Sequence, residues 1–158
     1  DGGRWSAERG GPSSPDAVIE VLNAAGIRIL RDETEAVQVR DRRILLTGLQ
    51  DLWSAEIRRD RAGFGVEADP RIVLAHNPDT KEILKDLPWN LMLCGHTHGG
   101  QIRLPFVGGR LTAPVNDDRF IEGLLPWNGR HLHISRGVGA LAGLRINCPP
   151  EVNLIDLT

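Results

Sequence analysis

Residues 71–78 have the sequence RIVLAHNP and residues 91–101 have the sequence LMLCGHTHGGQ, and these two stretches predict the centre of the fold. Each contains a continuous apolar run, at 72–75 and at 91–94, which is typical of a strand buried on both faces. Between them, residues 79–86 (DTKEILKD) predict a short helix with Asp79 near its N-terminus. Strand, helix and strand in this order predict a βαβ unit whose two strands lie parallel.

Histidines follow both apolar runs directly. His76 comes after the first run, and His96 and His98 come after the second, between Gly95 and Gly99. Because ligand sites of open α/β sheets lie beyond the carboxyl ends of the strands, we expect the three imidazoles to converge. Residues two apart in an extended segment point to the same side, and neutral imidazole suits Zn, Fe, Mn or Ni. The pattern favours a metal site over three ordinary loop histidines.

The rest of the chain predicts a loop over 1–13, a helix and several short strands. Ser14-Pro15 is typical of a helix start, with Ser14 as N-cap and Pro15 at the first helical position, and Gly26 is typical of a helix end. The Asp41-Arg42 pair predicts a hairpin turn. The predicted strands are 27–30, 36–40, 43–48, 102–104, 119–125, 130–135 and 152–157.

The composition is that of one globular domain. The 158 residues are 41% apolar and 25% charged, and the net charge of −2 and pI near 6.2 argue against a basic nucleic-acid-binding surface. No apolar run approaches the length of a membrane span. Two cysteines, Cys94 and Cys148, do not form a disulfide framework, and Cys94 at the end of an apolar run predicts a buried thiol.

The segment Gly95-His96-Thr97-His98-Gly99-Gly100-Gln101 resembles the glycine-histidine signature of bacterial calcineurin-like metallophosphoesterases, of the YaeI/YkuE-type phosphodiesterase subgroup. The upstream stretch at 76–78 (HNP) resembles the metal-binding histidine segment of that family. Weaker matches are 48–51 (GLQD), 135–139 (SRGVG) and 150–152 (PEV). The resemblance covers essentially the whole chain.

The resemblance implies an α/β fold: the C-terminal half of an αββα sandwich with two mixed sheets. Residues 1–158 would be the C-terminal portion of a single domain, because the Asp-x-His, Gly-Asp-x-x-Asp and Gly-Asn-His-Asp motifs of the N-terminal half are absent. Asp1 would be the last residue of Gly-Asn-His-Asp, with a catalytic role in orienting the general-acid histidine. Location in the cytoplasm, or at a membrane through an upstream segment, is left open.

The resemblance also implies a chemistry. His76 and His96 would bind one divalent ion and His98 a second, each ion being Mn, Fe or Zn. Asn77 and Arg136 would contact the substrate, although a turn residue and a surface arginine are the plain alternatives. The reaction would be hydrolysis of a phosphodiester or pyrophosphate small molecule, with lipid-linked and nucleotide-sugar substrates included by analogy with the subgroup.

Other candidates are weaker. His131 and His133 alternate along one predicted strand, which favours half-exposed strand positions over metal ligation. Asp51 follows a strand end, where a loop cap is the favoured role. Two rival functions remain: a mononuclear three-histidine zinc hydrolase complete within this chain, and a non-catalytic interaction module. Three imidazoles supply no negative charge to hold two cations together, so we expect the chain alone to be inactive.

Overall fold

The computed structural model describes residues 15–53, 56–65, 69–106, 108–109 and 112–157. Two α-helices, six strands and two short 3₁₀ turns are found in this part of the chain. In chain order they are α2 (Asp16–Ala24), β1 (Glu33–Val39), β2 (Arg42–Gly48), β3 (Arg71–Leu74), α3 (Thr80–Ile83), β4 (Leu91–Cys94), η1 (His98–Gly100), β5 (Gly123–Trp127), β6 (Arg130–Ile134) and η2 (Leu141–Gly143).

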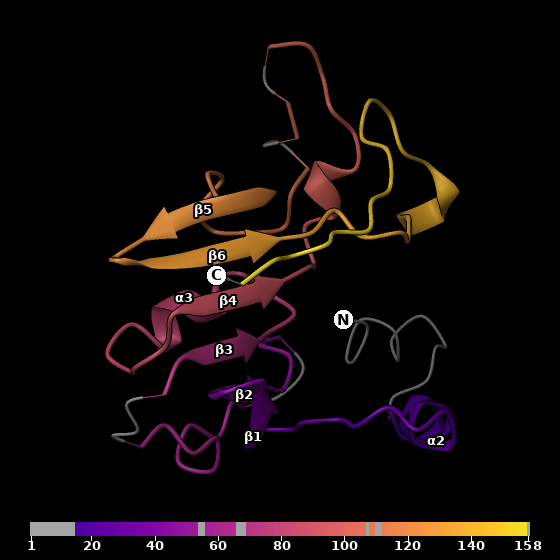
Figure 1. The fold of residues 1–158 in the computed structure, drawn as a ribbon. Coiled ribbons are helices and arrows are strands. Elements are labelled where there is room, and N and C mark those ends of the chain that lie inside the picture. The colour runs from indigo at the N-terminus through magenta and orange to yellow at the C-terminus, as the bar shows by residue number, and fades with distance from the viewer. Residues whose placement is uncertain (1–14, 54–55, 66–68, 107, 110–111, 158) are drawn as a thin grey trace.

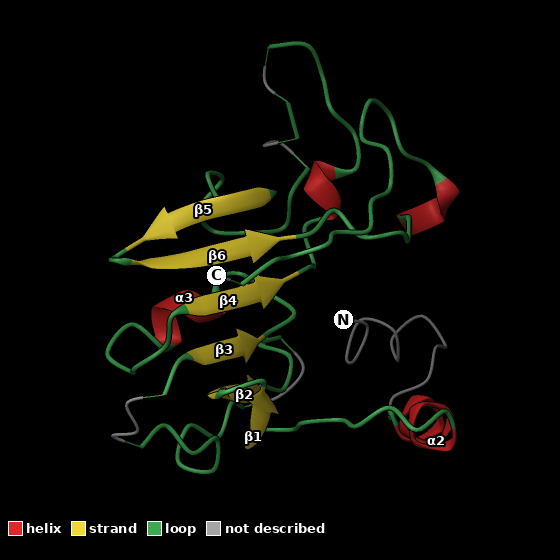
Figure 2. Cartoon of the chain, viewed as in Figure 1, coloured by secondary structure: helices red, strands yellow, loops and turns green. Residues whose placement is uncertain are grey.

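The strands form one mixed six-stranded sheet in the order β1-β2-β3-β4-β6-β5 (Figures 1 and 2). The four central strands are parallel, and β1 and β5 close the two edges as antiparallel partners. The predicted α/β class is therefore confirmed. The predicted parallel βαβ unit is confirmed too, because β3 and β4 pair in parallel within the sheet and α3 connects them along the chain. The described residues supply one of the two sheets that the sandwich architecture implies.

Three predicted strands are wrong. None of these apolar segments forms a continuous ladder of hydrogen bonds with a neighbouring strand. Residues 27–30 and 152–157 carry no strand, and 102–104 makes only isolated bridges. The predicted strand 119–125 is displaced, since β5 begins at Gly123. The β1–β2 turn is Arg40-Asp41 rather than Asp41-Arg42, and Arg40 takes a φ of 56° there. Ser14, the predicted N-cap, lies outside the described residues, and α2 begins after Pro15.

One face of the sheet makes the core. Val73, Met92 and Leu132 are fully buried there, and Leu84 and Trp89 pack over them from α3 and the loop that follows it. Full burial of an aliphatic side chain of this size stabilises the fold by about 1.5–3 kcal/mol. This packing fixes the register of the central strands, and so it fixes where each strand ends.

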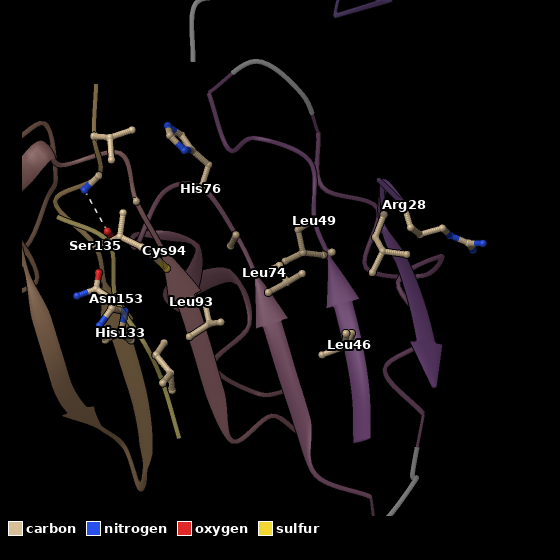
Figure 3. A pocket seen from close by; sticks show the side chains of 18 of the residues that line it. Arg28, Leu46, Leu49, Leu74, His76, Leu93, Cys94, His133, Ser135 and Asn153 are labelled. Carbon is tan, nitrogen blue, oxygen red and sulfur yellow. Dashed lines mark hydrogen bonds between the residues drawn. The ribbon is translucent and has the colours of Figure 1, made fainter. Parts of the chain in front are cut away.

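The opposite face is a shallow apolar groove of about 850 Å³ (Figure 3). Leu46, Leu74 and Leu93 line it from successive strands, because residues two apart in a strand share a face. Leu74 keeps 38% of its surface exposed, although strands of parallel sheets are ordinarily covered on both faces. His76 and Ser135 lie at the end of this groove where the strands terminate.

Both cysteines are reduced and buried, as predicted for Cys94. Burial raises the pKa of the Cys94 thiol to about 12, so this thiol stays protonated and unreactive. Among the described residues there is no helix with the length and apolar character needed to cross a membrane.

Candidate metal centre

His76 and His96 meet at the carboxyl edge of the sheet. Each stands two residues beyond the end of its strand, β3 for His76 and β4 for His96. The two strands are adjacent and parallel, and the Gly95 N–H donates to the His76 carbonyl at 3.0 Å, which keeps the two segments in register past the strand ends. The ring centroids lie 5.1 Å apart. The structure thus brings together two of the three predicted ligands.

His96 is held in one ring orientation by its surroundings. It is 5% exposed, has a φ of 69°, and meets the indole of Trp53 edge-on with centroids 4.4 Å apart. Its Nε2 lies 3.0 Å from the Pro114 carbonyl oxygen, and a carbonyl can only accept, so Nε2 carries the proton. Nδ1 is left with the lone pair, which is the form of imidazole that ligates a metal.

Both imidazoles are neutral at neutral pH. Burial is the largest of the effects that lower the pKa of His76 to about 4; the neighbouring His96 and His98 also lower it, while Asp51 opposes the shift. Burial also lowers the pKa of His96, against the opposing effects of its hydrogen bond to Pro114 and of Asp51. Neutral imidazoles offer lone pairs rather than protons, so these two residues fit a divalent cation.

Asp51 is closer to the centre than the sequence suggested. It follows the end of β2, the next parallel strand beside β3, and its charge acts on both His76 and His96. Its Oδ2 also accepts the backbone N–H of Trp53 at 3.1 Å, so the predicted loop cap is confirmed as well. The carboxyl ends of three neighbouring strands therefore deliver an aspartate and two histidines to one edge.

His98 begins the 3₁₀ turn η1 with a φ of 52°. Its Nδ1 lies 2.9 Å from Oε1 of Gln101, and a charge on His98 would lower the pKa of His76, which shows that the rings share one electrostatic environment. The described residues contain no group of three or more histidine, cysteine or acidic side chains arranged to hold a metal ion. The three-histidine ligand set therefore stays a prediction.

Gly99 and Gly100 of the histidine loop, which we define as residues 95–101, are required by close packing. A Cβ at Gly100 would overlap the backbone of Gly109, and a Cβ at Gly99 would lie 2.6 Å from Cγ of Arg136 and 2.9 Å from Sγ of Cys148. Both glycines also have positive φ values, 63° and 78°. Only glycine fits such positions, so the loop packs tightly against Gly109 on one side and against Arg136 and Cys148 on the other.

Arg136 is engaged by carboxylates. Its Nε donates to Oε2 of Glu151 at 2.8 Å, and Oε2 of Glu122 lies 3.7 Å from the same nitrogen. The hydrogen bonds to Glu151 raise the pKa of Arg136, and its backbone N–H is also bound by Glu151. The guanidinium thus supports the histidine loop from outside, and the predicted substrate contact of Arg136 stays untested.

Arg145 and Cys148 complete this support, and sequence reasoning missed both. Arg145 donates through Nη2 to the Arg136 carbonyl at 2.7 Å and through Nη1 to the His98 carbonyl at 3.2 Å. The Cys148 thiol also donates to the His98 carbonyl, at 3.2 Å. No local sequence pattern around Arg145 or Cys148 predicts these contacts, because they join His98 to residues 47 and 50 positions further along the chain.

The remaining candidates fall into three groups. Asn77 is completely buried and its Oδ1 accepts the Asp79 N–H at 2.8 Å, which is the predicted turn role, so a substrate contact stays untested. His131 is exposed on β6, and His133 is half-buried along the groove, as expected of strand positions. Asp1, the predicted catalytic residue, lies outside the described residues.

This chain is similar to several metallophosphoesterases among known proteins, which confirms the predicted resemblance to the calcineurin-like family. It is 48% identical over 139 residues to Phosphodiesterase YaeI of Escherichia coli K12, covering 87% of this chain and 50% of that protein. It is also 32% identical over 142 residues to the uncharacterized metallophosphoesterase YkuE of Bacillus subtilis, covering 87% of this chain and 49% of that protein.

A third relative carries a more specific name. UDP-2,3-diacylglucosamine pyrophosphatase LpxG of Chlamydia muridarum is 30% identical over 156 residues, covering 92% of this chain and 46% of that protein. The chain therefore spans about half the length of the curated relatives it matches. No protein-family model matches the chain, and no solved structure matches it.

Proposed function

We propose that this chain supplies part of the active site of a metal-dependent hydrolase that cleaves a phosphodiester or pyrophosphate bond. One observation carries the proposal: His76 and His96, both neutral, lie with ring centroids 5.1 Å apart at the carboxyl ends of adjacent parallel strands. The 48% identity to a phosphodiesterase supports the same reading. Neutral imidazoles with fixed orientation are the ligand type that zinc, manganese and iron accept.

In this proposal His76, His96 and His98 hold two divalent ions. Such ions supply positive charge to the phosphate oxygens and lower the pKa of water when bound. The protein's own residues place the ligands: the Pro114 carbonyl fixes the ring of His96, and the packing at Gly99 fixes the loop. Asp51 contributes negative charge beside His76 and His96, which reduces the repulsion that three neutral imidazoles cannot offset.

We also propose that residues 1–158 form the C-terminal portion of a single domain. The matched relatives are about twice as long as the aligned region, and the sheet leaves an apolar face with Leu74 exposed. A layer carried by the other half of such a protein would cover this face. That half would also bring the aspartate and histidine motifs that this sequence lacks, including the histidine next to Asp1.

The substrate we propose is a small phosphodiester or pyrophosphate. A nucleotide-sugar or lipid-linked pyrophosphate follows by analogy with the relative named UDP-2,3-diacylglucosamine pyrophosphatase. Contacts of Asn77 and Arg136 with this substrate are part of the proposal. Arg136 would reach a phosphate only after leaving Glu151, so its contribution depends on that ion pair opening.

The test is an activity assay on a chain of full family length. The part of E. coli Phosphodiesterase YaeI outside the aligned region is fused to this chain in its natural order, and hydrolysis of bis-p-nitrophenyl phosphate is measured with Mn²⁺ or Zn²⁺. His76→Ala and His96→Ala should each lower kcat/KM by more than about 100-fold, which is the upper range for a residue that merely orients a ligand. His131→Ala, which removes an exposed imidazole from β6, is the matched control and should leave activity unchanged.

Metal stoichiometry separates the rivals. Two ions per fused chain support the proposal, while one ion per chain with full activity would favour the mononuclear zinc hydrolase. No turnover by the fusion with metal bound and the upstream motifs intact would favour the non-catalytic module.

A further inference from the structure

Gln101, the last residue of the histidine loop, connects this loop to a turn that is distant in the sequence. Its Oε1 lies 2.9 Å from Nδ1 of His98, and the same oxygen accepts the backbone N–H of Leu141 at 2.8 Å. Its Nε2 donates to the Leu141 carbonyl at 3.0 Å. One side-chain amide therefore binds both backbone groups of a residue 40 positions away and one nitrogen of a histidine.

The contacts with Leu141 fix which end of the amide faces His98. A backbone N–H can only donate and a backbone carbonyl can only accept. If the amide were turned over, Nε2 would face the Leu141 N–H and Oε1 would face the Leu141 carbonyl, and both hydrogen bonds would be lost. The orientation of Gln101 is thus set by the backbone of Leu141, so an acceptor is presented to the imidazole.

An acceptor at Nδ1 selects one tautomer of His98. The Nδ1–H form donates to Oε1 of Gln101, whereas the Nε2–H form would set a nitrogen lone pair against that oxygen. In the selected form Nε2 is unprotonated and free to ligate a cation. This is the reverse of His96, whose Nε2–H is bound by the Pro114 carbonyl and whose Nδ1 carries the lone pair.

We propose that Gln101 is a positioning residue that keeps His98 in the Nδ1–H tautomer and so presents Nε2 to the metal. The proposal deepens the proposed function and rests on it for the metal, but the tautomer itself is a property of the metal-free chain. It also couples the turn at Leu141–Gly143 to the centre, since displacement of Leu141 would release the amide and then the imidazole.

Three variants separate positioning from a general structural role. Gln101→Met keeps the length of the side chain and removes both the acceptor and the donor. Gln101→Glu keeps acceptors for His98 and for the Leu141 N–H but loses the donation to the Leu141 carbonyl. Gln38→Met is the matched control, because among the described residues the Gln38 amide donates to the Arg40 carbonyl alone, on the exposed face of β1.

The primary measurement is the tautomer of His98 by ¹⁵N NMR of the histidine side chains in the 158-residue chain, assigned by the loss of signals in His98→Gln. We expect Nδ1–H in the original chain, in Gln101→Glu and in Gln38→Met, and a shift towards Nε2–H in Gln101→Met. Zn²⁺ or Mn²⁺ titration should show about 10–100-fold weaker binding for Gln101→Met, the usual effect of losing a group that orients a ligand. Gln101→Glu should restore the affinity.

The outcomes are distinct. An unchanged His98 tautomer in Gln101→Met overturns the proposal, whatever happens to stability or metal affinity. Equal metal affinity for Gln101→Met and Gln38→Met overturns its link to the centre. A third outcome is that the tautomer shifts as expected, but the fused full-length protein binds no metal, with the original sequence or with any variant. In that case the positioning role stands and the proposed function fails.

Discussion

Replacing Gly99 with alanine tests how tightly the histidine loop is packed. Gly99 has a φ of 63°, and an added Cβ would lie 2.6 Å from Cγ of Arg136, 2.8 Å from its Cδ and 2.9 Å from Sγ of Cys148. These atoms cannot yield easily, because the Arg136 guanidinium is bound to Glu151 and the Cys148 thiol is bound to the His98 carbonyl. Either the loop or the segment behind it must move.

The expected loss has two parts. A left-handed backbone costs an alanine about 1–2 kcal/mol relative to glycine. Inserting a methyl group into a well-packed site adds about 1–3 kcal/mol. We therefore expect Gly99→Ala to lower the free energy of unfolding by about 2–5 kcal/mol. The matched control is Gly129→Ala, which has a φ of 76° and no described atom within 4 Å of the added Cβ, so it carries only the backbone cost.

Urea unfolding followed by tryptophan fluorescence measures both variants. The Gly99→Ala curve should shift by about 1–3 kcal/mol more than the Gly129→Ala curve, which is the packing part alone. Equal losses would refute the packing argument. A double-mutant cycle with Arg136→Ala locates the clash, since the loss at Gly99 should shrink when Arg136 is truncated.

Three further predictions concern pH, charge and activity. The pKa of His76 is about 4 in the folded chain against 6.5 for an unburied imidazole, so the unfolded chain binds more protons between these two pH values. The contribution of His76 to the free energy of unfolding is therefore fully present above about pH 6.5 and is lost as the pH falls towards 4. His76→Gln should flatten the dependence of the melting temperature on pH over that window. Glu151→Gln should lower the free energy of unfolding by about 1.5–3 kcal/mol, because it weakens the charged hydrogen bonds to Arg136. The control is Asp117→Asn, which removes an exposed ion pair and should lower the free energy of unfolding by about 0–1 kcal/mol in the same urea titration. The 158-residue chain alone should not hydrolyse bis-p-nitrophenyl phosphate and should bind at most one Mn²⁺ ion in a calorimetric titration; turnover comparable to that of the fused full-length chain would favour the mononuclear alternative.

The sequence predicted those features that depend on neighbours along the chain. The apolar runs at 72–75 and 91–94 became β3 and β4 within one residue, because burial on both faces needs continuous apolar side chains. Their pairing followed from the short helix between them, which leaves only a parallel crossover. The placement of His76 and His96 at one edge is a consequence of that pairing alone.

Features that depend on distant contacts could not be predicted. The strand predicted at 152–157 has suitable apolar residues, yet among the described residues it has no neighbour with which to pair. Asp51 follows a strand end like the histidines, but a single aspartate in that position is more often a cap, and here it is both a cap and a source of charge at the centre. Its second role depends on the pairing of β2 with β3, and the local sequence around Asp51 does not predict that pairing.

The support of the histidine loop shows why a short, specific motif is not sufficient for a site. Residues 95–101 contain two of the three proposed ligands, but their conformation depends on Pro114 and on the segment from Arg136 to Cys148. Arg145 alone joins carbonyls at His98 and Arg136, and an arginine that binds carbonyls replaces the hydrogen bonds that an irregular loop cannot make within itself. The positive φ values of His96 and His98 are unfavourable for non-glycine residues and persist only when such contacts hold them. The geometry of the candidate metal centre therefore depends as much on Pro114 and on residues 136–148 as on the motif that carries two of the proposed ligands.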